Sequence, residues 1–237
     1  MAKDIVVLGA AATSRSIMDA IESINQVRPT WNILGFVDDN PALHGTEAYG
    51  YSVLGGAELV LRPEFREVSV VIGVANEGQL LIRKKISERL GLPPERYPVI
   101  AHPFSSVSPK ARVGPGCIIL FGARCSGDTN LGSHVVVLEG SCIGHDCEIS
   151  SFATICSLAT VGAYVRLGEG AFISTGAHLR GGISVGAESK VGIGSVCLRN
   201  VPAGKTVFGN PAAILDLGAP AVRQGKKGLL NPCPGSR

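Results

Sequence analysis

Apolar residues recur at every sixth position through most of the C-terminal half of the chain. Sixteen successive positions at this spacing hold an aliphatic residue or a cysteine, without one insertion. The residue four positions later is nearly always small, and glycine often follows the apolar residue directly. The sixteen positions are Val107, Val113, Ile119, Cys125, Leu131, Val137, Ile143, Ile149, Ile155, Val161, Leu167, Ile173, Leu179, Val185, Val191 and Cys197.

This period of six fits neither an α-helix nor a single strand, in which side chains alternate. It fits a backbone coil with three short flat faces, in which each apolar side chain points inward and a corner follows. Stacked coils lie about 4.8 Å apart, so the run from Val107 to Pro202 predicts a little over five coils, about 25 Å long. Flat sides of this kind can pair with other copies of the chain.

A different pattern fills residues 1 to about 98. Apolar runs predict strands over residues 4–8, 31–37 and 69–74, with helical patterns after the first and the third. Alternating strands and helices indicate a small parallel sheet of the Rossmann-like α/β class.

Helix boundaries are predicted from capping residues. Ser14 or Ser16 is expected to cap the first helix. The second helix is expected over residues 77–90, with Asn76 as its N-cap and Gly91 at its end.

Composition narrows the class of protein. With 31 glycines and only 5% aromatic residues, the chain suits a narrow interior with tight turns. A net charge of +3 with 17% charged residues argues against nucleic acid or a membrane surface as a partner. The seven cysteines include no CxxC pair, and no signal peptide or membrane-spanning run is present, so we expect reduced thiols and a cytoplasmic protein. Residues 216–237 are predicted to be a flexible tail without an assigned function.

Candidate ligand-binding residues follow the first two predicted strands. The turn from Gly9 and Ala10 to Ser14 can offer backbone amides to a pyrophosphate. Asp38 and Asp39 can accept hydrogen bonds from a ribose or a base at the same edge of the sheet. The glycines of a full GxGxxG motif are absent, so an ordinary strand–helix turn beside a solvated acidic loop is the open alternative.

Four segments together resemble the sialic acid O-acetyltransferase and nucleotide-amino-sugar N-acetyltransferase family of bacterial hexapeptide-repeat enzymes. The likeness covers about residues 4–215. The segments are Val7-Leu8-Gly9-Ala10, Gly35-Phe36-Val37-Asp38-Asp39, Ile143-Gly144-His145-Asp146-Cys147 and the closing run from Asn200 to Ala212.

The resemblance implies a left-handed parallel β-helix and a homotrimer. It implies acetyl transfer from acetyl-CoA to an amine or hydroxyl of a nucleotide-linked sugar, for bacterial surface glycans. Residues 1–98 are then expected to bind the nucleotide sugar. Residues 99–215 are expected to form the acyltransferase domain, with CoA lying between neighbouring subunits.

His145 is the candidate general base, because a histidine pKa suits proton removal from an attacking amine or hydroxyl. It falls on a predicted corner, and Asp146 can orient the imidazole or stabilise its cation. The family places a general base and a supporting acid at these positions. An ordinary surface histidine is the alternative.

The resemblance also implies a CoA site. It puts the thioester near Ala163, whose corner amides can stabilise an oxyanion. Backbone at Gly176 and Gly194 is expected to contact CoA, Lys205 to meet a phosphate, and Pro211 to lie near the adenine. A solvated turn lysine is an equally open interpretation of Lys205.

Two residues depart from the family pattern. Thr154 stands where many members have a second histidine near the acetyl group, and Leu138 stands where many have asparagine. Thr154 can still contact the substrate through one hydroxyl, whereas Leu138 cannot donate a hydrogen bond. The acceptor is therefore open.

Two rival functions remain open. A non-catalytic protein that only binds a nucleotide sugar is one. The other is a zinc-dependent carbonic anhydrase-like lyase, which needs three histidines at a subunit interface. The candidates His102, His134, His145 and His178 include no local ligand pair, so we expect no metal. His134 and His178 are instead expected to be exposed turn residues.

Overall fold

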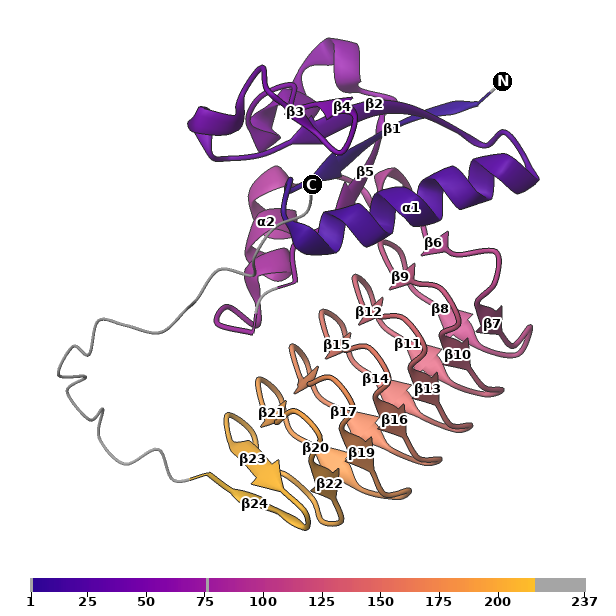
Figure 1. The fold of residues 1–237 in the computed structure, drawn as a ribbon, viewed down its shortest axis with the longest axis vertical. Helices are drawn as coiled ribbons and strands as arrows, with labels where there is room; N and C mark the ends of the chain where they lie inside the picture. The colour runs from indigo at the N-terminus through magenta and orange to yellow at the C-terminus, as the bar shows by residue number, and fades with distance from the viewer. Residues whose placement is uncertain (1, 76, 216–237) are drawn as a thin grey trace, which may run out of the picture.

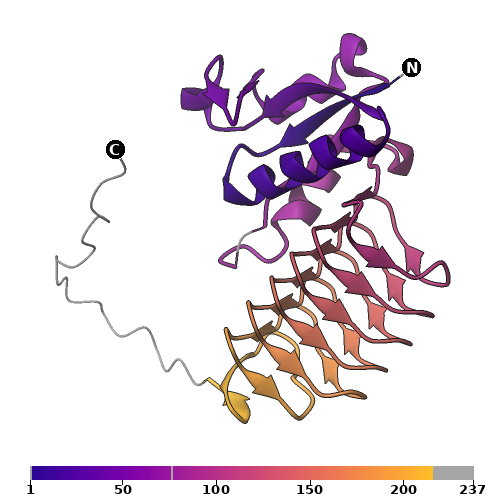
Figure 2. The same ribbon diagram turned by 45° about the vertical axis from the view of Figure 1, so that its right-hand side comes forward.

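An α/β region lies on one end of a column of short parallel strands (Figure 1, Figure 2). The computed structural model describes residues 2–75 and 77–215. None of the helices in these two ranges has the length and apolar character that crossing a membrane requires. The expected flexible tail, 216–237, lies outside the described residues.

The α/β region contains a parallel sheet of β2 (Trp31–Val37), β1 (Lys3–Leu8) and β5 (Ser69–Ile72), in that order. β1 is central and buries its four apolar residues, so the sheet class is confirmed. β5 ends two residues before the predicted end at position 74, although the N–H of Gly73 still donates to the Leu8 carbonyl.

Two α-helices flank this sheet, α1 (Ala12–Val27) and α2 (Ile82–Leu90). The predicted caps of α1 are wrong, because Ala11 precedes the helix without a side-chain cap and the buried Ser14 donates to the Gly73 carbonyl instead. α2 begins five residues later than predicted, after a turn. Asn76, its predicted N-cap, lies outside the described residues. Gly91 ends α2 in the left-handed conformation, as predicted.

Short elements complete the region. They are the 3-10 helices η1 (Pro41–Leu43), η2 (Ala57–Leu61), η3 (Pro63–Phe65) and η4 (Pro94–Arg96), and the hairpin strands β3 (Glu47–Ala48) and β4 (Tyr51–Ser52).

The column has three faces, which the chain visits in a fixed order. Face 1 contains β7 (Ser106–Val107), β10 (Arg124–Cys125), β13 (Cys142–Ile143), β16 (Thr160–Val161), β19 (His178–Leu179) and β22 (Val196–Cys197). Face 2 contains β8 (Arg112–Val113), β11 (Asn130–Leu131), β14 (Glu148–Ile149), β17 (Arg166–Leu167) and β20 (Ser184–Val185). Face 3 contains β6 (Ile100–Ala101), β9 (Ile118–Ile119), β12 (Val136–Val137), β15 (Thr154–Ile155), β18 (Phe172–Ile173), β21 (Lys190–Val191), β23 (Thr206–Gly209) and β24 (Ala212–Ile214).

The six-residue period is confirmed, because the second residue of each two-residue strand from β7 to β22 is the apolar residue that faces the shared interior. The column is longer than predicted at both ends. Ala101 continues the period upstream of Val107, but alanine is too small to be recognised as one of the large apolar residues that define the pattern. Downstream the last corner is shortened, and Val201 pairs with Val185 in place of a regular strand.

Corners turn tightly because many of their second residues adopt a left-handed backbone, glycines and also Asp128, Asp146 and Tyr164. The glycine before a corner lets neighbouring coils approach. A Cβ at Gly144 would lie 2.6 Å from the Ala163 nitrogen of the next coil.

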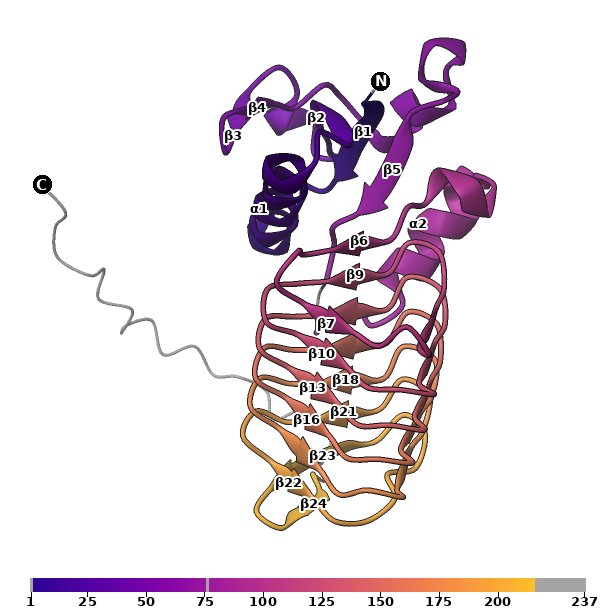
Figure 3. The ribbon, with the colours of Figure 1, turned by 90° about the vertical axis from the view of Figure 1, so that its right-hand side faces the viewer.

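The α/β region covers one end of face 3. Ile17 and Ile21 of α1 pack in one cluster with Ile118 and Val136 of β9 and β12. Figure 3 shows α1 lying over β6 while α2 follows another side of the column. We call the three lines of corners edge 1–2, edge 2–3 and edge 3–1, after the faces that each line joins.

Candidate active site

His145 and Asp146 form the corner between β13 and β14, on edge 1–2. The His145 Nδ1 lies 2.6 Å from Asp146 Oδ2, and the two side chains are 56% and 43% exposed. Asp146 has a φ of 56°, a left-handed conformation that aspartate tolerates better than most residues. The predicted pair is therefore present as a contact between adjacent side chains.

This contact leaves the other ring nitrogen of His145 available. When Nδ1–H donates to the carboxylate, the lone pair lies on Nε2, the atom that can accept a proton. The ring of Tyr164, one coil further along the same edge, meets the imidazole edge-on with 5.1 Å between ring centres. Tyr164 thus supports one side of the imidazole, a role that the sequence did not reveal.

Cys147 follows this pair but faces the interior. Its Sγ lies 3.1 Å from the Gly162 carbonyl, and burial raises the pKa of the thiol. A thiol without ready ionisation is a poor nucleophile, so the site favours direct attack by the acceptor over an acyl-cysteine intermediate.

The predicted CoA residues lie on different edges of the column. Ala163 shares edge 1–2 with His145, and its N–H donates to no described residue, so it is available to an oxyanion. Gly176 and Gly194 lie on edge 3–1, where a Cβ added at either glycine would have no neighbour within 4 Å. Lys205 is exposed near edge 2–3. A single copy of the chain therefore does not bring these residues together.

Pro211 lies at the far end of the column. It lines a groove of about 490 Å³ together with residues of β22, β24 and the segment between β22 and β23. The lining is mainly apolar, which suits the flat ring of an adenine.

The predicted nucleotide residues do come together at the carboxyl ends of β1 and β2. The N–H of Ala10, beside Gly9, donates to Asp38 Oδ2 over 2.8 Å. The other Asp38 oxygen accepts from the Asn40 N–H, and His44 Nε2 lies 2.8 Å from the Asp38 carbonyl. Asp38 thus holds the first turn against the loop after β2.

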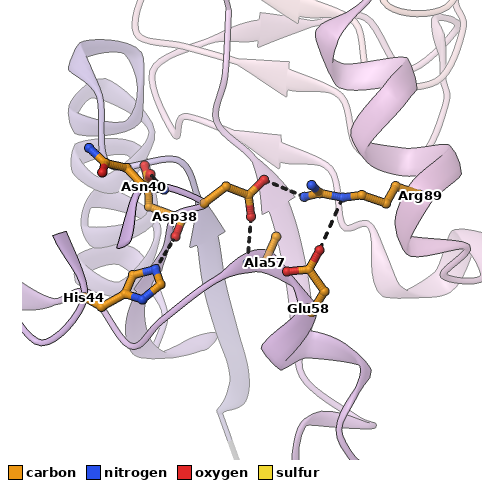
Figure 4. A network of polar contacts seen from close by, with 7 residues as sticks. Asp38, Asn40, His44, Ala57, Glu58 and Arg89 are labelled. Carbon is orange, nitrogen blue, oxygen red and sulfur yellow. Dashed lines mark hydrogen bonds and ion pairs between the residues drawn. The ribbon is translucent and has the colours of Figure 1, made fainter. Parts of the chain in front are cut away.

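Asp39 belongs to a second network, whose other members Ala57, Glu58 and Arg89 are labelled in Figure 4. Its carboxylate accepts from Arg89 of α2 over 2.6 Å and from the Ala57 N–H over 3.0 Å, and Glu58 lies 3.7 Å from the same arginine. Burial alone would raise the pKa of Asp39, but these hydrogen bonds and the arginine charge outweigh it and lower the pKa. Asp39 is therefore ionised, and its carboxylate joins the loop after β2 to Ala57 and to Arg89 of α2.

The start of α1 lies beside Asp38 and lacks a cap. No acidic residue occupies its first turn, and the guanidinium of Arg15 lies 4.1 Å from the ring centre of Tyr49. Uncapped N–H groups and a nearby cation suit a phosphate. Arg15 was missed from the sequence because nothing indicates that the distant Tyr49 holds it in place.

The two departures from the family pattern have different surroundings. Thr154 is buried, and its Oγ1 accepts from Arg83 over 2.8 Å. Leu138 packs against the apolar cluster beneath α1. Neither lies on the edge of the same chain that carries His145.

The remaining histidines do not gather. His134 was expected to be exposed, but it is only 4% exposed because Tyr97, beside η4, and Phe152 cover its ring. His102 is also buried, whereas His178 is exposed as predicted, although on a strand of face 1. Over residues 2–75 and 77–215, no three potential ligands among His, Cys, Asp and Glu are arranged to hold a metal ion.

Comparisons with known proteins cover both parts of the chain. Residues 4–90 match the family model described as the PglD N-terminal domain. The GDP-perosamine N-acetyltransferase of Escherichia coli O157:H7 is 30% identical over 212 residues, which span 87% of this chain and 93% of that protein.

Solved structures give the same result. The acetyltransferase domain of PglB from Neisseria gonorrhoeae FA1090 has a TM-score of 0.80 at 29% identity, covering 90% of this chain and 100% of that domain. The same domain in complex with acetyl coenzyme A has a TM-score of 0.80 at 28% identity, and the match covers 91% of this chain and 100% of that domain. With a matching first domain, a matching column and a full-length relative, the resemblance is confirmed, and this chain belongs to the family of nucleotide-amino-sugar acetyltransferases with hexapeptide repeats.

Proposed function

We propose that this chain transfers an acetyl group from acetyl-CoA to an amine or hydroxyl of a nucleotide-linked sugar destined for a bacterial surface glycan. The observation that carries the proposal is the 2.6 Å contact between His145 Nδ1 and Asp146 Oδ2 on an exposed corner. The E. coli relative is named for acetylating a GDP-linked amino sugar, and the PglB domain has been solved with acetyl-CoA, which supports both substrate classes.

The proposed chemistry is direct acyl transfer. The acceptor nitrogen or oxygen bonds to the acetyl carbon, the carbon–sulfur bond breaks, and the proton passes through His145 Nε2 to the departing thiolate. Asp146 stabilises the imidazolium that forms between these two steps. The N–H of Ala163 is a candidate to bind the oxyanion, because it donates to no described residue and lies on the same edge as His145, one coil away.

We also propose that the active unit is a trimer built around face 1. Edges 1–2 and 3–1 flank this face, so a ring of three copies would bring His145 and Ala163 of one copy opposite Gly176 and Gly194 of the next. Large apolar side chains on edge 3–1 support this arrangement. They are Phe104 (73% exposed), Phe121 (57%), Leu158 (64%) and Ile193 (64%).

In this proposal residues 1–98 bind the nucleotide at the turn of Gly9 and Ala10 and at Asp38 and Asp39. Ser14, which is buried, supports this turn from inside through the Gly73 carbonyl. Residues 99–215 bind CoA and carry out the chemistry, with Lys205 and Pro211 as further contacts to CoA. Thr154, which was predicted to contact the acceptor, is buried and accepts a hydrogen bond from Arg83. A cytoplasmic location belongs to the proposal and suits the six described cysteines, all of which are free thiols.

The test is a turnover assay with acetyl-CoA and a panel of nucleotide-linked amino sugars, in which a thiol reagent detects released CoA. We expect wild-type turnover with at least one acceptor, and a loss of about 10²- to 10⁴-fold in kcat for His145→Ala. Mass spectrometry and lability to hydroxylamine then distinguish an amide from an ester product.

Asp146→Asn tests the supporting carboxylate, and Asp128→Asn is its matched control. Asp128 occupies the equivalent corner one coil earlier, with the same φ of 56° but no histidine partner. We expect a clear fall in kcat for Asp146→Asn and wild-type rates for Asp128→Asn. Acceptors that stabilise the protein without any turnover would instead support the non-catalytic alternative, and equal rates for wild type and His145→Ala would reject the general base.

A further inference from the structure

Arg83, near the start of α2, is the largest fully buried side chain of the described residues, with 1% of its surface exposed. Its neighbour Lys84 pairs with Glu169 at the surface over 2.9 Å. No carboxylate among the described residues pairs with Arg83, and all its hydrogen bonds go to neutral oxygens. Burying a guanidinium cation without a carboxylate partner costs free energy, so the presence of an arginine at this position needs an explanation.

The hydrogen bonds of Arg83 join two parts of the molecule. Nη1 donates to the Val74 carbonyl over 3.1 Å, in the segment that follows β5. Nε donates to the His134 carbonyl over 3.1 Å, on edge 2–3 of the column. Nη2 donates over 2.5 Å to the Phe152 carbonyl, over 3.2 Å to the Ala153 carbonyl and over 2.8 Å to Thr154 Oγ1.

Val74 lies against the predicted nucleotide turn. A Cβ at Gly9 would lie 2.8 Å from a Val74 methyl group, and Ser14 Oγ donates to the carbonyl of Gly73 over 3.4 Å. The segment that Arg83 holds therefore supports the turn that carries Gly9. At its other end, Arg83 holds β15 of the column, which includes the predicted substrate contact Thr154.

We infer that Arg83 is a positioning residue for acetyl transfer, which fixes the nucleotide end of the α/β sheet relative to the column. The inference rests on the proposed function, because it assumes that the acceptor bound on the sheet must meet an acetyl group bound on the column. A displacement of the acceptor of about 1 Å can cost about 100-fold in rate. Loss of Arg83 should therefore affect turnover more than the binding of either substrate.

The experiment compares Arg83→Lys and Arg83→Met with the control Lys84→Met, which removes the adjacent exposed contact between the same two parts. For each variant we would measure kcat, KM for both substrates, Kd for the nucleotide sugar, and the thermal unfolding transition. We expect Arg83→Lys to fold and to lose at least about tenfold in kcat, with KM and Kd within about threefold of wild type. Lys84→Met should retain wild-type values throughout.

The other outcomes are decisive too. Wild-type kcat in Arg83→Lys and Arg83→Met would overturn the positioning role, as would a loss confined to Kd, which would make Arg83 only a support of the nucleotide turn. Loss of cooperative unfolding in both variants would make Arg83 a folding residue and reject the inference. A wild-type protein without transferase activity would reject the proposed function itself, independently of any variant.

Discussion

Mild acid should destabilise this protein through His134. The ring of His134 is enclosed by Tyr97 and Phe152, and its Nδ1 has no hydrogen-bond partner among the described residues. Burial, and to a lesser degree the charge of Arg83, lowers the pKa of His134 to about 4. The folded protein therefore keeps this histidine neutral at a pH where the unfolded chain would protonate it.

The size of the effect follows from proton linkage. The unfolded histidine takes up a proton below its ordinary pKa of 6.5, whereas the folded one does so only near 4. Stability is therefore lost as the pH falls from about 6.5 toward about 4, and none is lost through this group at higher pH. At about 1.4 kcal/mol for each unit of pKa, the loss is about 2 kcal/mol at pH 5 and about 3 kcal/mol when complete.

The assay is urea unfolding from pH 7.5 to 4.5, followed by circular dichroism, for wild type and His134→Asn. Asparagine tolerates the left-handed φ of 55° at this position but does not titrate. Losing the ring contacts lowers stability at every pH, so only the pH dependence of the difference is informative. Protein concentration is held constant because the proposed trimer would make the measured stability depend on it. If the two stability curves run parallel between pH 7.5 and 4.5, the buried neutral histidine is not the cause and the reasoning fails.

Two further predictions concern coil packing and assembly. Gly144→Ala should lower the free energy of unfolding by about 1–3 kcal/mol in urea titrations, because its Cβ would lie 2.6 Å from the next coil. Gly127→Ala, whose Cβ would have no neighbour closer than 3.5 Å, should change it little, and equal effects would contradict the packing argument. Leu158→Asp should reduce the mass measured by light scattering from that of a trimer to that of a monomer, because it puts a charge in the proposed interface. Val27→Asp, at a site 73% exposed on α1, should leave the mass unchanged, and a wild-type monomer would remove the basis of the trimer.

The column could be predicted from the sequence because its rule is local and repeated. Each inward position needs an apolar residue that fits a narrow interior. Because the same requirement recurs every six residues, the repeat can be recognised even where one position is ambiguous. The corner position of His145 follows from the same rule, since it lies two residues after the inward Ile143. The ends of the column were less predictable, because Ala101 is too small to mark the period and Val201 departs from it.

Features that depend on the docking of distant segments could not be predicted. His134 has the sequence pattern of an exposed corner, but its ring is buried between Phe152 of the next coil and Tyr97, which comes from outside the column. Arg83 itself stands in a run of basic residues that resembles a solvated helix surface, beside Lys84 and Lys85. Only the contact between the α/β region and edge 2–3 distinguishes the buried arginine from the lysines that follow it.

This use of edge 2–3 limits where a second copy can bind. The α/β region covers part of face 3, and α2 contacts edge 2–3 through Arg83 and Lys84. Face 2 presents a ladder of exposed polar side chains, in which Arg112 bonds to Asn130 and Asn130 bonds to Glu148. The charged and polar groups of such a ladder form their remaining hydrogen bonds more readily with water than in a protein interface. Face 1 with its two edges is therefore the part of the column that the proposed trimer can use, and His145 lies on one of those edges. In the proposed trimer, the contacts that fix the α/β region therefore also determine which side of the column a second copy can approach.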